Sequence, residues 1–147
     1  MEAAEFIVVA AKMVSLGKGG ARSAISRAYY GAFHLASEFV REIAGETVGS
    51  GAAHNLVVQY LGATKDTNAT SIARLLGDLH TYRIRADYRL TETVVETTAF
   101  AKNCVEFAHT IQSQLAELRQ ACDRDPHLRQ AVVNGVAEVK RAHRMTR

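Results

Sequence analysis

The stretch Ala21–Gly45, ARSAISRAYYGAFHLASEFVREIAG, predicts one long helix with two different faces. At 3.6 residues per turn, its apolar side chains fall on one broad arc, which is typical of a helix that packs on a core. These are Ala24, Ile25, Ala28, Tyr29, Ala32, Leu35, Ala36, Phe39, Val40 and Ile43. A polar stripe on the opposite side contains Ser23, Arg27, Tyr30, His34, Glu38 and Arg41. Such a stripe is usually a solvated face, but tyrosine and histidine between two arginines also suit a ligand-binding surface.

The rest of the chain predicts more helices and no strand, because apolar residues recur at three and four and the alternation of strands is missing. We expect these helices at about residues 2–16, 52–61, 70–88 and 92–122, and from 126 into the C-terminal tail. The residues expected to end or cap them are Gly17–Gly20, Thr70 or Ser71, Thr91 or Thr93, and Asp125 with Pro126. The fold class is therefore all-α, an up-and-down bundle of four to five helices with an additional C-terminal helix. Residues 1–122 would form the bundle, and residues 123–147 a basic extension packed on it or projecting from it.

Length and composition favour a single domain, since 147 residues with 48% hydrophobic side chains can bury one core. Glu2 and Glu5 stand where a secretory signal would be positive, and the apolar run Phe6–Ala11 is too short to span a bilayer. We therefore expect a cytoplasmic protein with no membrane partner. Cys104 and Cys122 lie about five turns apart on one expected helix, too far to pair, and are expected to be buried. No Cys or His cluster has metal-ligand spacing, so we expect no metal and no cofactor.

The net charge of +3 is unevenly distributed. Arg119–Arg147 holds seven basic and three acidic residues, which makes this end +4 and the remainder about −1. A basic end suits RNA or another acidic partner, and a solvated terminal helix explains it equally well.

A second unusual feature is Arg83, which falls at the centre of the apolar arc of the helix expected at 70–88. Burying an unpaired charge is costly, so Arg83 needs a partner, and Asp87 at i+4 is the nearest. Tyr88 adds a hydroxyl near the same end, and His80 lies at the edge of the arc. The pair would either close the bundle as a structural ion pair or line a cleft that holds a ligand.

Two segments together, SRAYYGAFH at Ser26–His34 and RIRADY at Arg83–Tyr88, resemble the HEPN (higher eukaryotes and prokaryotes nucleotide-binding) family. The likeness is to its small stand-alone prokaryotic proteins with an Arg-x-x-Ala-Asp-Tyr signature, and it covers about Arg22 to Thr110. It implies a four- to five-helix bundle and a homodimer with a basic cleft between protomers. The ligand-binding residues that it implies are Arg27, Tyr30, His34, Arg83, Asp87 and Tyr88.

Many HEPN proteins are metal-independent ribonucleases that use an arginine followed by a histidine after four to six residues. Histidine would serve as general acid and base, and arginine would stabilise charge on the phosphorane. No histidine follows Arg83 at that distance, and the formal matches are Arg27 with His34 and Arg74 with His80. Only Arg27 and His34 share a helix face. If the chain is a ribonuclease, the catalytic candidates are therefore Arg27, His34, Arg83 and His80.

Three functions remain open. The favoured one is a nucleotide- or RNA-binding module of a prokaryotic toxin–antitoxin or defence-type system, acting as a dimer beside a nucleotidyltransferase-type or antitoxin partner. The second is a metal-independent endoribonuclease toxin. The third is a non-catalytic helical interaction module, in which the polar stripe binds a protein and Arg83 with Asp87 only locks the bundle.

Overall fold

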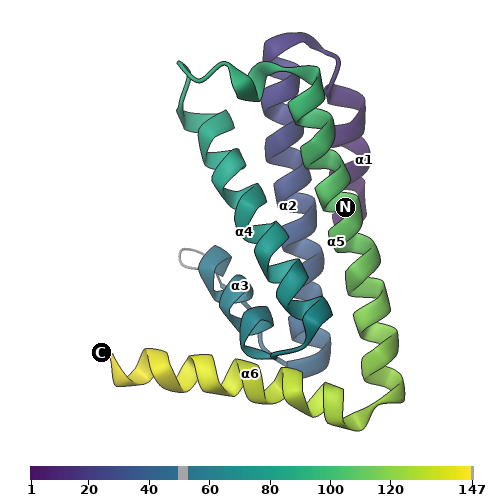
Figure 1. The fold of residues 1–147 in the computed structure, drawn as a ribbon, viewed down its shortest axis with the longest axis vertical. Coiled ribbons are helices and arrows are strands. Elements are labelled where there is room, and N and C mark those ends of the chain that lie inside the picture. Colours follow the sequence, from purple (N-terminus) through teal and green to yellow (C-terminus); the bar gives the residue numbers. More distant parts are fainter. Residues whose placement is uncertain (50–52, 147) are drawn as a thin grey trace. The chain divides into compact units, whose positions relative to one another are not determined.

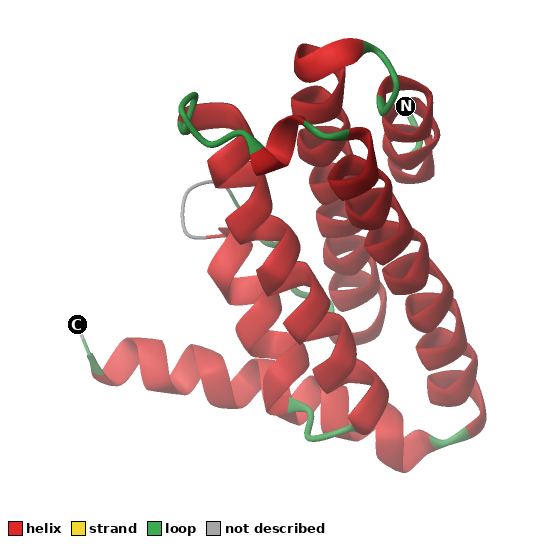
Figure 2. Cartoon of the chain, turned by 45° about the horizontal axis from the view of Figure 1, so that its top comes forward, coloured by secondary structure: helices red, strands yellow, loops and turns green. Residues whose placement is uncertain are grey.

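The computed structural model describes residues 1–49 and 53–146, and these form helices joined by short loops, with no strand among them (Figure 2). In chain order the elements are α1 (Ala3–Met13), α2 (Gly17–Ala44), α3 (Ala53–Ala63), α4 (Thr67–Tyr88), the 3₁₀ turn η1 (Val94–Glu96), α5 (Thr98–Arg124) and α6 (Pro126–Met145) (Figure 1). The all-α prediction, with its C-terminal helix, is confirmed. Within the described residues, no helix combines the length and the apolar character that crossing a membrane requires.

The chain divides into two compact units. Unit 1 is Met1–Leu35 with Leu75–Gln112, and unit 2 is Ala36–Arg74 with Ser113–Arg147. The boundary between the units falls inside α2, α4 and α5. The expected division into residues 1–122 and 123–147 stays a prediction.

Unit 1 is held together by close packing of α1 on the N-terminal half of α2. A Cβ atom added to Gly31 would lie 2.7 Å from Ile7 Cγ1, so the two helices meet at the glycine backbone. Ile7, Ile25 and Tyr29 are almost completely buried in this unit. Burial of such large apolar side chains is the main term that stabilises a core of this kind.

Unit 2 is built on the contact between α3 and α6, which lie against each other in Figure 1. Gly135 of α6 allows this approach, because a Cβ there would lie 3.0 Å from the Thr64 backbone nitrogen. Val132 and Val136 bury the apolar face of α6.

The apolar arc predicted for the long helix at Ala21–Gly45 is mostly buried, in one unit or the other. Leu35 is the exception among these residues, because it is only half-buried.

The glycine-rich segment differs from its prediction as a helix stop. Gly17 begins α2, and the residues up to Gly20 belong to its first turn. Gly17 has φ +74°, a left-handed conformation that glycine adopts without steric cost. A Cβ on Gly20 would lie 2.6 Å from the Met13 carbonyl oxygen. The chain therefore turns tightly after α1, and α2 begins at once within the glycine-rich segment. A run of glycines in the sequence does not distinguish this arrangement from a loop.

The start of α4 also lies earlier than predicted. The helix begins at Thr67, so Thr70 and Ser71 do not cap it. Asp66 does so, because its Oδ2 accepts a hydrogen bond from the Ala69 backbone nitrogen at 3.0 Å. Asp66 is also of a residue type that commonly caps helices, and the contacts of the folded chain show that it is the cap.

The caps of the last two helices give one wrong and one correct prediction. Neither Thr91 nor Thr93 caps α5; instead, Thr97 Oγ1 accepts a hydrogen bond from the backbone nitrogen of its third residue, at 3.2 Å. Asp125 caps α6 as predicted, with Pro126 in the first turn. The aspartate–proline pair is the clearer signal because proline fits only the first turn of a helix.

The two cysteines are buried and free, as expected. Burial raises the pKa of Cys104 to about 12 and also raises that of Cys122. Both thiols therefore stay protonated and behave as small apolar side chains.

Candidate functional site

The centre of the candidate site is Arg83, which lies in the part of α4 that belongs to unit 1. Its side chain is only 10% exposed. The guanidinium carbon lies 5.7 Å from the ring centroid of Tyr29, 5.3 Å from that of Tyr30 and 5.8 Å from that of Tyr88. The faces of aromatic rings attract cations, most strongly where water is excluded. Arg83 is therefore held by three tyrosines.

The polar contacts of Arg83 involve its Nη2 and Nε atoms. Its Nη2 donates a hydrogen bond to the Tyr30 hydroxyl at 3.0 Å. Its Nε lies 3.8 Å from Asp87 Oδ2, so the expected i+4 ion pair forms at a distance too long for a hydrogen bond. Among the described residues, the buried Nε has no hydrogen-bond partner. A buried donor left in this way costs about 1–3 kcal/mol, and such groups occur more often at functional sites.

A cavity of about 240 Å³ lies beside this cluster, within unit 1. The residues that line it are Met13, Ser23, Ser26, Arg27, Tyr30 and Asp87. Tyr30 and Asp87 contact both the cavity and Arg83. Ser26 Oγ donates a hydrogen bond to Asp87 Oδ2 at 3.2 Å. Arg27 is exposed, and its guanidinium carbon lies 5.8 Å from the ring centroid of Phe6.

The wall of this cavity contains both a cation and an anion. Arg27 and the Ser23 hydroxyl supply hydrogen-bond donors and Asp87 supplies acceptors, while the Ser26 hydroxyl donates to Asp87 and that of Tyr30 accepts from Arg83. Concave sites in which a few polar groups converge are typical binding sites. The arrangement suits a ligand that has both an anionic group and hydroxyl groups.

The two histidines among the sequence candidates lie elsewhere in unit 1. His34 is exposed, with its ring centroid 5.4 Å from that of Phe6. His80 is half-buried, with its ring centroid 5.3 Å from that of Tyr29. Burial and the nearby Arg83 lower the pKa of His80, which keeps its imidazole neutral at neutral pH. The described residues that line the cavity include neither histidine.

The structure thus divides the six expected ligand-binding residues into three sets. Arg27, Tyr30 and Asp87 share the cavity wall. Arg83 lies behind Tyr30 and Asp87, and the exposed Tyr88 covers another side of its guanidinium. His34 contacts the ring of Tyr30 at 6.4 Å between centroids and lies outside this group.

Arg22, which sequence reasoning missed, makes more hydrogen bonds than any of these residues. Its guanidinium donates to the carbonyl oxygens of Ala86 and Glu92, both at 2.8 Å, and to Glu96 Oε1 at 2.7 Å. It also reaches the carbonyl oxygens of Arg85, Arg89 and Leu90. The last carbonyls of a helix have no partner within it, and a guanidinium has five donors for them. Arg22 therefore fixes the C-terminal end of α4, where Asp87 is located.

A second ion-pair group stabilises the same connection. Arg85 Nε donates to Glu92 Oε2, and Arg89 Nη1 lies 3.3 Å from Glu92 Oε1. The hydrogen bond from Arg85 is the main cause that lowers the pKa of Glu92. The loop after Tyr88 is thus held both by Arg22 of α2 and by the ion pairs that Glu92 forms with Arg85 and Arg89.

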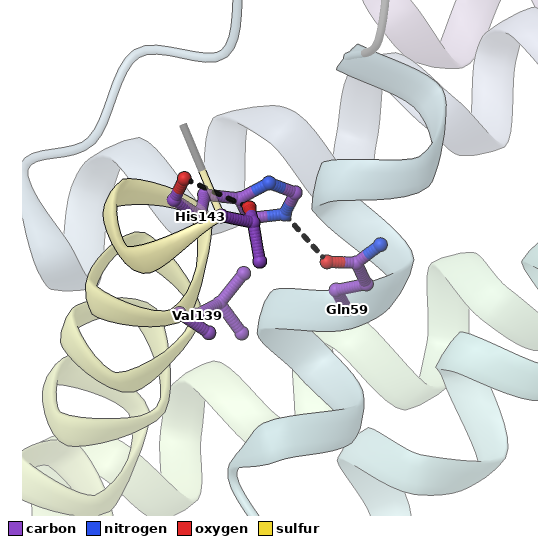
Figure 3. A pocket seen from close by; sticks show the side chains of 5 residues that line it. Gln59, Val139 and His143 are labelled. Carbon is purple, nitrogen blue, oxygen red and sulfur yellow. Dashed lines mark hydrogen bonds between the residues drawn. The ribbon is translucent and has the colours of Figure 1, made fainter.

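A larger cavity of about 370 Å³ lies in unit 2, between α3 and α6 (Figure 3). Gln59, Val139, Ala142, His143 and Thr146 line it. His143 Nε2 and Gln59 Oε1 point toward each other and are 2.9 Å apart, so these polar groups already satisfy one another. Val139 and Ala142 give the rest of the wall an apolar character.

Within the described residues, no group of three or more His, Cys, Asp or Glu side chains is placed to hold a metal ion. Comparisons with family models, with curated proteins and with solved structures give no match.

Proposed function

We propose that this chain is a nucleotide- or RNA-binding module, and that its phosphate-binding site is the unit 1 cavity beside Arg83. The observation that carries the proposal is the wall of this cavity, which combines the Arg27 guanidinium with three hydroxyl groups. A second guanidinium, that of Arg83, lies behind it and bonds to the Tyr30 hydroxyl. Arginine is the preferred side chain for phosphate, because its planar donors match phosphate oxygens and it keeps its charge.

The resemblance to the HEPN family supplies the rest of the proposal. The chain would act as a homodimer in a prokaryotic toxin–antitoxin or defence-type system, beside a nucleotidyltransferase-type or antitoxin partner. The two family-like segments, Ser26–His34 and Arg83–Tyr88, are those that meet at the cavity through Ser26 and Asp87. Their contact in space supports treating them as one site.

A metal-independent endoribonuclease is the second candidate, and His80 favours it. A neutral imidazole can accept a proton, and His80 is kept neutral by burial and by Arg83. Both His80 and Arg83 contact the ring of Tyr29. The binding module ranks first because His80 does not belong to the described cavity wall.

The test measures binding of a fluorescent single-stranded RNA 12-mer to the full chain, by anisotropy, in excess chelator and at fixed salt. We expect Arg27→Ala to weaken binding at least tenfold, since one hydrogen bond to a charged group contributes about 1.5–3 kcal/mol. Arg74→Ala is the matched control: Arg74 is an exposed arginine on α4 in unit 2, and its loss should change the affinity by about twofold or less.

The same reactions are then run on a sequencing gel. Intact RNA supports the binding module, whereas cleavage that disappears in His80→Ala makes the chain a ribonuclease. Absence of binding at millimolar protein, or equal losses in Arg27→Ala and Arg74→Ala, contradicts a phosphate site in this cavity.

A further inference from the structure

The presence of Asp87 in the cavity wall is not explained by phosphate binding. Its carboxylate lines the same 240 Å³ space as the Arg27 guanidinium. A site that only held a phosphate would be weakened by this carboxylate, because like charges repel at short range. Pairing with Arg83 accounts for only part of its role, since the ion-pair distance is 3.8 Å and no hydrogen bond forms.

The contacts of Asp87 leave one of its oxygens available. Both the Ser26 hydroxyl and Arg83 Nε approach Oδ2. Within the described part of the chain, no hydrogen bond involves Oδ1. A carboxylate oxygen accepts about two hydrogen bonds, so Asp87 can accept a donor from a ligand. The Ser26 hydroxyl beside it can rotate to donate or to accept.

A hydroxyl group of the ligand fits this acceptor. The hydroxyls nearest to the phosphate of a nucleotide are those of its sugar, and a carboxylate that accepts from the ribose 2′-hydroxyl is a recurrent means of nucleotide recognition. The cavity is smaller than the roughly 300–1,000 Å³ typical of sites for drug-sized ligands, so it suits a sugar-phosphate unit better than a whole nucleotide.

We infer that Asp87, assisted by Ser26, makes this cavity selective for ribose over 2′-deoxyribose. The inference rests on the proposed function and adds a specificity to it. Arg27 contributes affinity for any phosphate, and Asp87 recognises the 2′-hydroxyl, which is the group that distinguishes RNA from DNA. Without that hydroxyl, the Asp87 carboxylate faces the ligand with no donor to offset its repulsion of the phosphate.

The experiment compares a single-stranded RNA 12-mer with the DNA 12-mer of the same sequence, with uracil in both, on wild type and variants. In wild type we expect RNA to bind about tenfold more tightly, as the loss of one hydrogen bond to a charged acceptor predicts. Asp87→Ala should bring the RNA-to-DNA affinity ratio close to one. It removes a negative charge as well, so the ratio, and not the affinity itself, is the readout.

Two variants serve as controls for the ratio. Arg27→Ala should weaken both ligands and leave the ratio unchanged. Asp78→Ala removes a carboxylate from the same helix and the same unit, outside the cavity wall, and should also leave the ratio unchanged. Ser26→Ala spares Arg83 and should lower the ratio, which keeps the test decisive if Asp87→Ala does not fold.

The possible failures are distinguishable. If neither 12-mer binds, the proposed function is wrong. If both bind wild type equally, or if the preference for RNA survives in folded Asp87→Ala, phosphate binding stands and the selectivity assigned to Asp87 is overturned.

Discussion

Two cavities in the described part of the chain differ in a way that their sizes do not reveal. The cavity of unit 2, at about 370 Å³, is the larger, but its polar groups bond to each other and Val139 and Ala142 complete its wall. The cavity of unit 1, at about 240 Å³, brings a guanidinium, a carboxylate and three hydroxyls together. Polar groups that converge on one concave space are typical of a binding site, and volume alone is not.

The ion pairs of the two units show the same contrast. In unit 1, the side chains of Arg22 and Glu96 are 12% and 14% exposed. In unit 2, those of Arg119 and Glu42 are 38% and 48% exposed, at the same N–O distance of 2.7 Å. Equal geometry does not mean equal contribution to stability, because water screens the exposed pair and has little access to the buried one.

The largest expected effect tests this contrast in stability. Arg22→Ala removes the buried cation that pairs with Glu96 and leaves it, among the described residues, only the exposed Lys18 at 3.9 Å. It also removes the donor to the Ala86 and Glu92 carbonyl oxygens, so the free energy of unfolding should fall by about 3 kcal/mol or more. Arg119→Ala should cost less than about 1 kcal/mol. Urea unfolding monitored by circular dichroism measures both. Similar losses in the two variants would show that burial does not separate these pairs.

One substitution at each cavity, with RNA affinity and unfolding free energy measured for both variants, tests whether the cavities have different roles. Arg83→Met keeps much of the side-chain volume, so the unfolding free energy should change by less than about 2 kcal/mol, while RNA affinity falls about tenfold. Val139→Ala removes buried methylene-sized groups from unit 2 and should cost about 1 kcal/mol without changing RNA affinity. Anisotropy and urea unfolding on the same samples give both quantities. A loss of RNA affinity in Val139→Ala would contradict the assignment of RNA binding to the unit 1 cavity alone.

The smallest expected effect concerns pH. His80 has a pKa below its ordinary value of 6.5, so the unfolded chain binds a proton there more readily than the folded chain. This stabilisation of the fold is complete above the ordinary pKa and is lost as the pH falls below 6.5 toward the lowered pKa. The midpoint of thermal unfolding should therefore decrease between pH 7.5 and 5.5 by less in His80→Gln than in wild type. An identical decrease of the midpoint in both proteins would show that titratable groups other than His80 cause it.

Part of this arrangement is predictable from the sequence. Helical periodicity alone puts Arg83 on an apolar arc with Asp87 one turn on, because both positions depend only on spacing within one helix. The role of Arg22 is not predictable in this way. Most of its partners are backbone carbonyls, which any sequence has, and they lie more than sixty residues away. The cavity depends likewise on α1, since Met13 lines it beside residues of α2 and α4.

Gly31 has no functional group, yet it controls the dimensions of the candidate site. Any side chain there would collide with Ile7, which lies only 2.7 Å from the Cβ position, and would force α1 away from α2. Met13, at the end of α1, would move with the helix, and the part of the cavity wall that it forms would shift. The width of this cavity is therefore set by a residue that is not part of its wall.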